Sequence, residues 1–279
     1  MPEGPEIRRE ADEIEKSISG KPLKKIYFKF ERLKEFEPVL VGSALLFVQT
    51  VGKGFVLHFD CGLSFYGHNQ LYGKWRVGSQ IPGECDIGKR ELRASFEAEG
   101  AGAYLFSASE MEVIPTEEVL EIPFIKRNNG FDVLGRDCNE VEVLDFIDNP
   151  KFQKKSLAAL LLDQKFILGM GNYLRSEVLF CARINPESRL MDLNLEQKGE
   201  LSLWTIEIMK RAYRHKGVTN DLKREQKLKS QGIDYESRRF FVFDREDKNC
   251  YECGSIIKRI EKSGRRLYFC PNCQKNQKK

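Results

Sequence analysis

The chain has 279 residues and a modest net charge of +4, with 41% hydrophobic and 32% charged residues. This length and composition predict a globular protein with more than one core, because single hydrophobic cores stop growing near this size. No apolar stretch reaches the roughly 18 to 20 residues of a membrane span, and the N-terminus is acidic where a signal peptide is basic, so we expect a cytoplasmic protein.

Eight cysteines occur in the chain, and four of them are isolated: Cys61, Cys85, Cys138 and Cys181. Small secreted proteins that depend on disulfides carry a denser and more regular set. We therefore interpret the isolated cysteines as reduced thiols.

The N-terminal stretch MPEGPEIRRE predicts the start of a helix. Proline is favoured in the first turn of a helix, and the glutamates on either side of Pro5 match the positive end of the helix dipole. Apolar residues follow at helical spacing, at Ile7, Ala11, Ile14 and Ile18, and Gly20 ends the run. This helix does not need Pro2. Removal of Met1 would leave Pro2 with a free secondary amine beside the Glu3 carboxylate.

Short strand-like runs follow this helix. They cover residues 23–30, 44–51, 55–60, 63–67, 73–77, 91–97 and 103–108. A Gly52-Lys53-Gly54 turn separates the second run from the third, and by pattern alone Lys53 is a solvated turn lysine. Many short strands with turn signals between them predict a β-sandwich or a barrel.

The stretch SFYGHNQLYGKW places Gln70, Leu71 and Tyr72 between two strand-like runs. By pattern alone the favoured structure is a hairpin whose leucine and tyrosine fold back into the core. The alternative is a wedge that enters a DNA duplex and fills the space left by an extruded base.

From about Asn139 the apolar period becomes helical, and the runs at 140–148, 155–163, 173–184 and 195–215 predict a helical domain. One helix breaks at residues 169–171, Gly-Met-Gly, and Asn172 suits the N-cap of the next helix. Such a turn can leave backbone N–H groups facing a phosphate, although the pattern alone favours an ordinary turn between helices. Residues 215–239 are charged and have almost no apolar pattern, so we predict a long mobile loop.

The C-terminal segment carries two Cys-x-x-Cys pairs, which are Cys250 with Cys253 and Cys270 with Cys273. Sixteen residues separate the pairs, a spacing typical of one tetrahedral structural zinc site. The segment between them predicts a hairpin that turns at Ser263-Gly264. A module of some 40 residues buries too little apolar surface to fold alone, and zinc supplies the missing stability.

The charge of the chain is unevenly distributed. From Lys210 to the end there are 20 Lys and Arg against 9 Asp and Glu, a net +11, whereas residues 1–209 have 26 against 33, a net −7. This asymmetry indicates a polyanionic partner, although a solvated basic face fits the composition nearly as well.

Taken together, these motifs resemble the formamidopyrimidine-DNA glycosylase/endonuclease VIII family, closest to its bacterial endonuclease VIII branch. The resemblance covers the whole chain. It depends on MPEGPE, the turn at Lys53, HNQLYG, PFIKRNNGFDVL, LLLDQKFILGMGNYLRSE and the paired cysteines, with Arg265 five residues before Cys270. It implies an α+β multidomain fold with an N-terminal helix and β-sandwich, a helical domain with a helix-two-turns-helix element, and a C-terminal zinc β-hairpin.

The resemblance also implies roles for particular residues. Pro2 corresponds to the nucleophile, Glu3 to the acid/base, Lys53 to a catalytic lysine and Arg265 to the hairpin arginine that contacts phosphate near the lesion. Residues expected to contact DNA are Gln70, Leu71, Tyr72, Arg127 and Asn172. Glu6 matches a further acidic position with no assigned task.

The resemblance predicts a bifunctional DNA glycosylase and AP lyase of base excision repair that holds one zinc ion and acts as a monomer on damaged double-stranded DNA, with no membrane or obligate protein partner. We expect β,δ-elimination through a Schiff base and a preference for oxidised pyrimidines. The alternatives are a sister enzyme that prefers oxidised purines, and a zinc-ribbon DNA-binding protein without catalysis. Predicted domains are the catalytic domain at 1–130, the helical domain at 131–238 and the zinc finger at 239–279.

Overall fold

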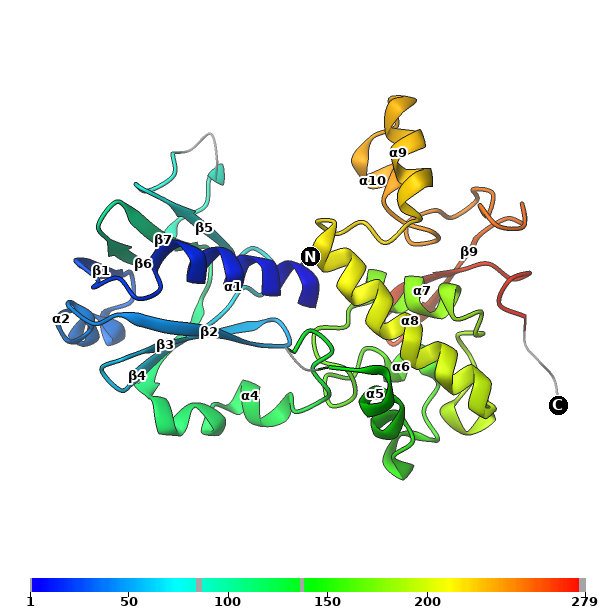
Figure 1. The fold of residues 1–279 in the computed structure, drawn as a ribbon, viewed down its shortest axis with the longest axis horizontal. Coiled ribbons are helices and arrows are strands. Elements are labelled where there is room, and N and C mark those ends of the chain that lie inside the picture. Colours follow the sequence, from blue (N-terminus) through cyan, green and yellow to red (C-terminus); the bar gives the residue numbers. More distant parts are fainter. Residues whose placement is uncertain (1, 84–86, 136–137, 276–279) are drawn as a thin grey trace. The chain divides into compact units, whose positions relative to one another are not determined.

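The computed structural model describes residues 2–83, 87–135 and 138–275. Its contacts divide the chain into two compact units. The first contains Ile7–Asn128 with Met1–Pro2, and the second contains Glu3–Glu6 with Asn129–Lys279. The first long helix, α1 (Gly4–Ile18), therefore contributes residues to both units (Figure 1). Met1 and Cys85 lie outside the described residues.

The first unit is a sandwich of two antiparallel four-stranded sheets. One sheet has the order β2 (Leu45–Val51), β3 (Gly54–Phe59), β4 (Leu63–His68) and β8 (Glu110–Pro115). The other has the order β1 (Lys25–Phe28), β6 (Leu92–Ala98), β7 (Ala101–Phe106) and β5 (Lys74–Gly78). Short helical segments are Glu31–Phe36, α2 (Glu37–Leu40), Thr116–Glu121 and α4 (Pro123–Arg127). The predicted sandwich is confirmed, and the barrel is not formed.

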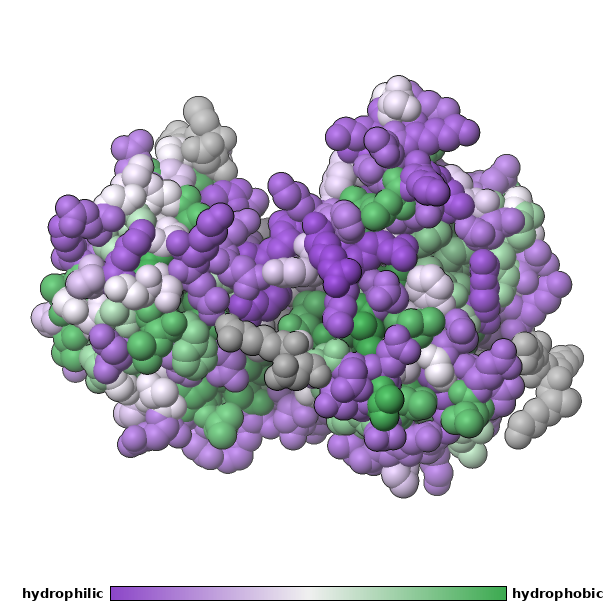
Figure 2. Space-filling view, viewed as in Figure 1, coloured by the Kyte–Doolittle hydropathy of each residue, from purple (hydrophilic) through white to green (hydrophobic). Residues whose placement is uncertain are grey.

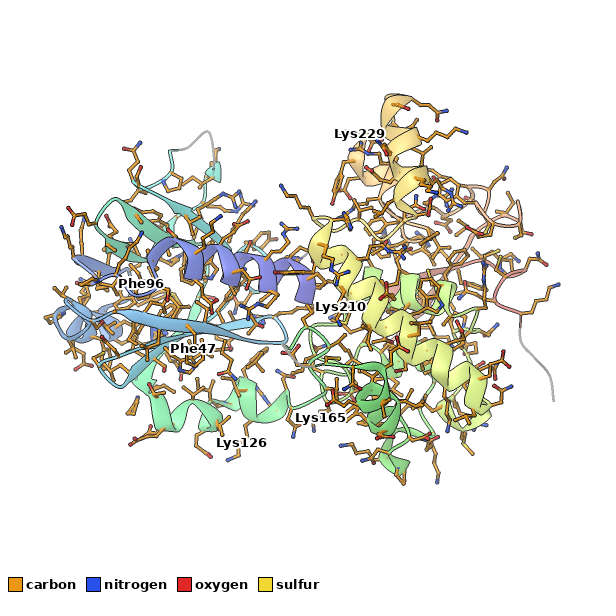
Figure 3. The ribbon with its side chains drawn as sticks, in the orientation of Figure 1. Phe47, Phe96, Lys126, Lys165, Lys210 and Lys229 are labelled. Atoms are coloured by element: carbon orange, nitrogen blue, oxygen red, sulfur yellow. The ribbon has the colours of Figure 1, made fainter. Side chains whose placement is uncertain are left out.

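Aromatic rings fill the space between the two sheets. Phe96 on β6 is fully buried inside this unit (Figure 3) and meets Phe65 on β4 edge to face, with 5.0 Å between ring centroids. Trp75 contacts both rings, with 6.3 Å between its centroid and that of Phe96 and 6.2 Å to that of Phe65. The apolar stripe of α1 packs into the same core, because all four of its predicted residues are fully buried. The inward-facing residues of the strands and the apolar stripe of α1 are thus buried in the same core.

Strand β8 was absent from the predicted strands. Its buried residues Met111 and Val113 alternate with Glu110 and Glu112, so the period of two is present but short. The strand pairs with β4 at one edge of its sheet. Two glutamates and a proline in six residues have low strand propensity, and pairing with β4 overrides it.

The second unit is helical around its own core. Its helices are α5 (Glu140–Ile147), α6 (Leu157–Leu160), α7 (Asn172–Cys181) and α8 (Leu195–Arg214). Short helical turns also occur at Pro150–Phe152 and Leu190–Asp192. Asn139 and Asn194 cap α5 and α8 through complete capping boxes. Helix α7 contacts both α8 and the second strand of the C-terminal hairpin, and its first turn is the centre of the site described below.

The prediction of a mobile loop at 215–239 is wrong. This segment forms α9 (Leu222–Ser230) and α10 (Tyr235–Arg238), whose N-termini are capped by the side chains of Asp221 and Asp234. Helix α9 buries no residue, and Figure 2 shows a mostly hydrophilic surface over both helices. Periodicity detects a helix through its apolar stripe, so a helix that is polar all round escapes it.

The C-terminal hairpin consists of β9 (Lys258–Lys262) and β10 (Arg265–Phe269). Its turn is Ser263-Gly264, as predicted, and both residues have positive φ, at 53° and 66°. A two-residue turn with this geometry matches the twist of the strands it joins. Among the described residues, no helix has the length and apolar character needed to cross a membrane.

Candidate active site

Glu3 is buried at the N-terminus of α7, where only 3% of its surface is exposed. One oxygen of its carboxylate accepts the Tyr173 N–H at 3.0 Å, and the other accepts the Leu174 N–H at 3.3 Å. The first N–H groups of a helix have no partner within the helix, and the helix dipole favours a negative charge there. Glu3 therefore caps α7, although 170 residues of chain separate it from Tyr173.

The prediction of Asn172 as an N-cap is wrong by one position. Helix α7 includes Asn172 as its first residue, and Gly171 occupies the cap without a side-chain hydrogen bond. The capping interaction comes instead from the carboxylate of Glu3. Two of the N–H groups that a Gly-x-Gly turn leaves available for a phosphate are thus already occupied within the protein.

Glycines make this close approach possible. The N–H of Gly4 donates to the carbonyl of Gly169 at 2.8 Å, and a Cβ atom on Gly4 would lie 3.0 Å from the Cα of Gly169. A Cβ atom on Gly171 would lie only 2.1 Å from the Cδ of Glu3. The PEGPE and Gly-Met-Gly motifs therefore pack directly against each other, and glycine on both sides leaves the space for this contact.

The first turn of α1 adds a second carboxylate to the site. Glu6 accepts the backbone N–H of Glu3 at 2.9 Å and the hydroxyl of Tyr173 at 3.0 and 3.1 Å. Burial and the negative charges of Glu6 and Glu3 raise the pKa of Tyr173 well above its ordinary value, so the phenol stays protonated and donates. Tyr173 was not predicted, because an aromatic residue early in an apolar helix resembles an ordinary core residue.

Asn172 is connected to the C-terminal hairpin through Arg175, whose side chain is fully buried. Arg175 donates to the Asn172 side chain at 2.6 Å, to the Ala158 carbonyl at 2.7 Å and to the Arg266 carbonyl at 3.2 Å. Burial and the charge of Arg265 lower the pKa of Arg175 to about 10, which leaves it charged at neutral pH. Arg265 itself is exposed at the start of β10.

Arg175 was also missed by sequence reasoning. An arginine and a glutamate inside the mostly apolar run YLRSEVLF were the available signal, because charged residues are rarely buried unless they are paired. Glu177, two residues further along the helix, is buried as well. It accepts the N–H groups of Phe241, Val242 and Phe243 at 2.8 to 2.9 Å and the Thr219 hydroxyl at 2.5 Å.

The other candidates lie in the first unit. Pro2 is partly exposed. Lys53 lies in the two-residue turn between β2 and β3, and Gly54 follows it because a Cβ atom there would lie 3.2 Å from the ring of Phe124. Burial lowers the pKa of His68; the charge of Glu110 opposes this shift and the charge of Lys53 adds to it. Arg127 is exposed at the end of α4, where its Nε donates to the Pro123 carbonyl at 3.0 Å.

Gln70, Leu71 and Tyr72 form the exposed tip of the loop between β4 and β5. Leu71 is 63% exposed and Tyr72 is 72% exposed, so neither folds back into the core. Gln70 has a positive φ of 50°, its N–H donates to the His68 ring at 3.0 Å, and its side-chain oxygen accepts the Ser109 hydroxyl at 2.7 Å. The tip thus exposes two large side chains to solvent, while hydrogen bonds from Gln70 to His68 and from Ser109 to Gln70 hold the loop beside them.

The four cysteines of the C-terminal pairs come together as predicted. Their sulfur atoms all lie within 4.8 Å of one another, with 3.9 Å between Cys250 and Cys273 and 3.4 Å between Cys253 and Cys270. Sulfur atoms bound to one tetrahedral zinc at about 2.3 Å lie roughly 3.8 Å apart, whereas a disulfide brings them to about 2.05 Å. The set therefore fits one structural zinc ion, held by four thiolates with no position open for a substrate.

An N-terminal sandwich, a helical unit and a zinc hairpin together define the architecture of a class of DNA glycosylases, and three family models match the chain accordingly. The formamidopyrimidine-DNA glycosylase N-terminal domain matches residues 1–107, the H2TH domain of the same enzymes matches 134–223, and a zinc finger found in these enzymes and in an isoleucyl-tRNA synthetase matches 248–276. The chain belongs to the formamidopyrimidine-DNA glycosylase/endonuclease VIII family, whose members are DNA glycosylases with AP lyase activity.

Relatives of full length support this assignment. The chain is 41% identical over 275 residues to an endonuclease 8 of Enterobacter sp., covering 99% of this chain and 100% of that protein. It is 38% identical, with the same coverage, to an endonuclease 8 of Salmonella paratyphi A. These full-length matches to DNA glycosylases contradict the alternative of a zinc-ribbon DNA-binding protein without catalysis.

Solved structures share the fold. The Lactococcus lactis Fpg protein in complex with DNA containing an abasic site aligns with a TM-score of 0.76 at 23% identity, covering 98% of this chain and 100% of that one. The same protein with an N7-benzyl-Fapy-dG DNA aligns with a TM-score of 0.77, also at 23% identity, covering 99% and 100%.

Proposed function

We propose that this DNA glycosylase and AP lyase removes oxidised pyrimidines from duplex DNA through a Schiff base on Pro2. The observation that carries the proposal is the position of the Glu3 carboxylate. Glu3 follows Pro2 directly in the chain, and its buried carboxylate accepts hydrogen bonds from two N–H groups of α7. A carboxylate fixed in this way is suited to exchange protons with a sugar that is bound to the adjacent amine.

The chemistry favours a terminal amine over a lysine. An α-amine titrates at about 7.7 to 8.0 and a lysine at about 10.4, so the terminal amine is neutral hundreds of times more often near pH 7. Attack of the neutral Pro2 nitrogen on C1′ breaks the bond to the damaged base, which leaves with a proton. The amine then loses its own proton, the C1′–O4′ bond breaks as O4′ takes up a proton by way of Glu3, and an iminium ion with a fixed positive charge remains. The iminium accepts electrons as sugar protons leave, so the strand breaks by β-elimination and then by δ-elimination. This route requires prior removal of Met1.

The remaining candidates fit supporting roles. Lys53 is proposed as a second catalytic residue, Arg265 and Asn172 as phosphate contacts and Arg127 as a further DNA contact. The exposed Leu71 and Tyr72, together with Gln70, are suited to fill the duplex where a base has been extruded. Zinc would hold the hairpin that presents Arg265 and would take no part in the reaction.

The preference for pyrimidines is supported by the similarity to endonuclease 8 proteins. We further propose that the protein acts as a monomer in the bacterial cytoplasm at the nucleoid. A purine-preferring sister enzyme remains the alternative, and equal or faster excision of 8-oxoguanine opposite cytosine would favour it over the pyrimidine assignment.

Borohydride trapping tests the proposal directly. The protein is incubated with a duplex that contains dihydrouracil, the imine is reduced, and the adduct is located by peptide mass. An adduct on Pro2 without Met1 is expected, together with strand scission. Glu3→Gln is expected to lose base excision while duplex binding survives. The absence of both adduct and scission, on this duplex and on an abasic duplex, would overturn the proposed mechanism.

A further inference from the structure

Glu10 lies in the middle of α1 and contacts the loop that carries the exposed tip. One oxygen of its carboxylate accepts a hydrogen bond from the Asn69 side-chain amide at 2.9 Å. Asn69 is 1% exposed and directly precedes the tip residues Gln70, Leu71 and Tyr72. A buried residue therefore stands at the base of the exposed tip, and an acidic residue of another element holds it.

Asn69 also closes the loop at its far end. The carbonyl of Asn69 accepts the N–H of Gly73 at 2.7 Å, and a Cβ atom on Gly73 would lie 2.4 Å from that carbonyl oxygen. The three tip residues are thus enclosed in a tight turn that runs from Asn69 to Gly73 and is closed by the Asn69 carbonyl. Asn69 consequently holds both ends of the tip, in addition to the hydrogen bonds of Gln70 with His68 and Ser109.

Among the described residues, Glu10 is the partner that fixes the Asn69 side chain. The side-chain oxygen of Asn69 is buried and has no hydrogen-bond partner among the residues that the structure describes. The side-chain amide is therefore held through its nitrogen alone. Without Glu10, a buried amide would have neither end satisfied, which is costly. The loop would then relax toward water.

The carboxylate of Glu10 is itself poorly solvated. Burial raises its pKa to about 7, although the Asn69 hydrogen bond, the charges of Lys74 and Arg76 and a hydrogen bond from the Trp75 backbone oppose the shift. All of these opposing groups come from the loop or from β5, which follows it. The α1 helix and the two ends of the tip loop therefore meet at one side chain.

We propose that Glu10 is a positioning residue, which holds Asn69 and thereby keeps Leu71 and Tyr72 in place to enter a duplex. This inference rests on the proposed function of the tip as a wedge. The wedge occupies a gap that exists only in duplex DNA, because a single strand has no opposite base and no stack to fill. Loss of the anchor should therefore affect duplex substrates selectively.

The experiment compares abasic DNA as a duplex and as a single strand. We expect Glu10→Ala to lower kcat/KM on the duplex by about tenfold and to leave the single strand within about twofold, because the freed tip must be ordered again on binding. Asn69→Ala breaks the same bond from the loop side and should give the same ratio. Glu10→Gln keeps an acceptor for Asn69 and should restore duplex activity. Glu13→Ala, at an exposed position of the same helix, is the matched control.

Epistasis adds a second readout. In a Leu71→Ala background the wedge is already lost, so Glu10→Ala should cause no further loss on the duplex. Equal losses on both substrates, or full duplex activity in Glu10→Ala and Asn69→Ala, would overturn the anchor. If the wild-type protein cleaves neither substrate, the proposed function has failed instead. Should Glu10→Ala not fold, the Asn69→Ala and Glu10→Gln pair decides the question.

Discussion

Replacing Glu10 by glutamine removes an ionisable group from a place that disfavours its charge. The pKa of Glu10 rises from 4.5 to about 7 in the folded protein. The folded state therefore binds this proton more tightly than the unfolded state, and ionisation costs stability that grows from pH 4.5 upward and is complete above pH 7. A shift of about 2.5 pH units at 1.36 kcal/mol each corresponds to about 3 kcal/mol.

The stability gained in Glu10→Gln should consequently depend on pH. At pH 5 most of the cost in the wild-type protein is absent, so the gain should be about 2 kcal/mol smaller than at pH 8.5. The two tryptophans lie in different units, and Trp75 is 2% exposed in the sandwich core beside Glu10. Urea unfolding followed by tryptophan fluorescence in a Trp204→Phe background therefore reports on the first unit alone.

Two controls define the result. Glu13→Gln removes an exposed carboxylate from the same helix and should change the unfolding free energy by the same small amount at both pH values. A Glu10→Gln protein that gains equal stability at pH 5 and pH 8.5, or that loses stability at pH 8.5, would refute the reasoning that burial of this carboxyl group is costly.

Three further predictions concern the second unit. Glu177→Ala should lower the unfolding free energy by about 3 to 5 kcal/mol in urea titrations, because three buried N–H groups lose their acceptor; an effect below 1 kcal/mol would contradict this. Arg175→Met should speed amide exchange in β10 while exchange in the sandwich stays unchanged, because the Arg266 carbonyl loses its donor. Cys250→Ser should reduce bound zinc from one ion per chain in metal analysis and weaken duplex binding, and retention of stoichiometric zinc would argue against the four-thiolate site.

The sequence predicted most elements that bury an apolar face, with β8 as an exception, and it missed helix α9, which buries none. The stripe of α1 and the alternating strands were visible because burial selects apolar residues at a fixed period. Helix α9 has no such stripe, and it is stabilised by the Asp221 cap and by the pair between Glu225 and Arg238 at 2.6 Å. Capping signals were present at this helix, but without an apolar face they carried little weight.

For the site, the sequence indicated which residues matter but not, in most cases, which residues they contact. The zinc cysteines were predictable because two Cys-x-x-Cys pairs at this spacing are typical of a zinc site, in which all four cysteines bind the same ion. The cap of α7 was assigned to Asn172 because capping is normally local, whereas the carboxylate that performs it comes from Glu3 at the other end of the sequence. A single sequence gives no means of pairing residues so far apart.

Helix α1 combines two demands that explain why its sequence is unusual. Its first turn must fit against the Gly169 to Gly171 turn, so Gly4 is small and Glu3 lies where Gly171 leaves room for a carboxylate. Its middle must present a carboxylate to Asn69, which places a poorly solvated acid in a helix that is otherwise amphipathic. Neither feature improves the helix itself, and the second lowers stability above neutral pH. The first feature holds Glu3, next to the proposed nucleophile, on the first turn of α7, and the second holds the loop that carries the proposed wedge.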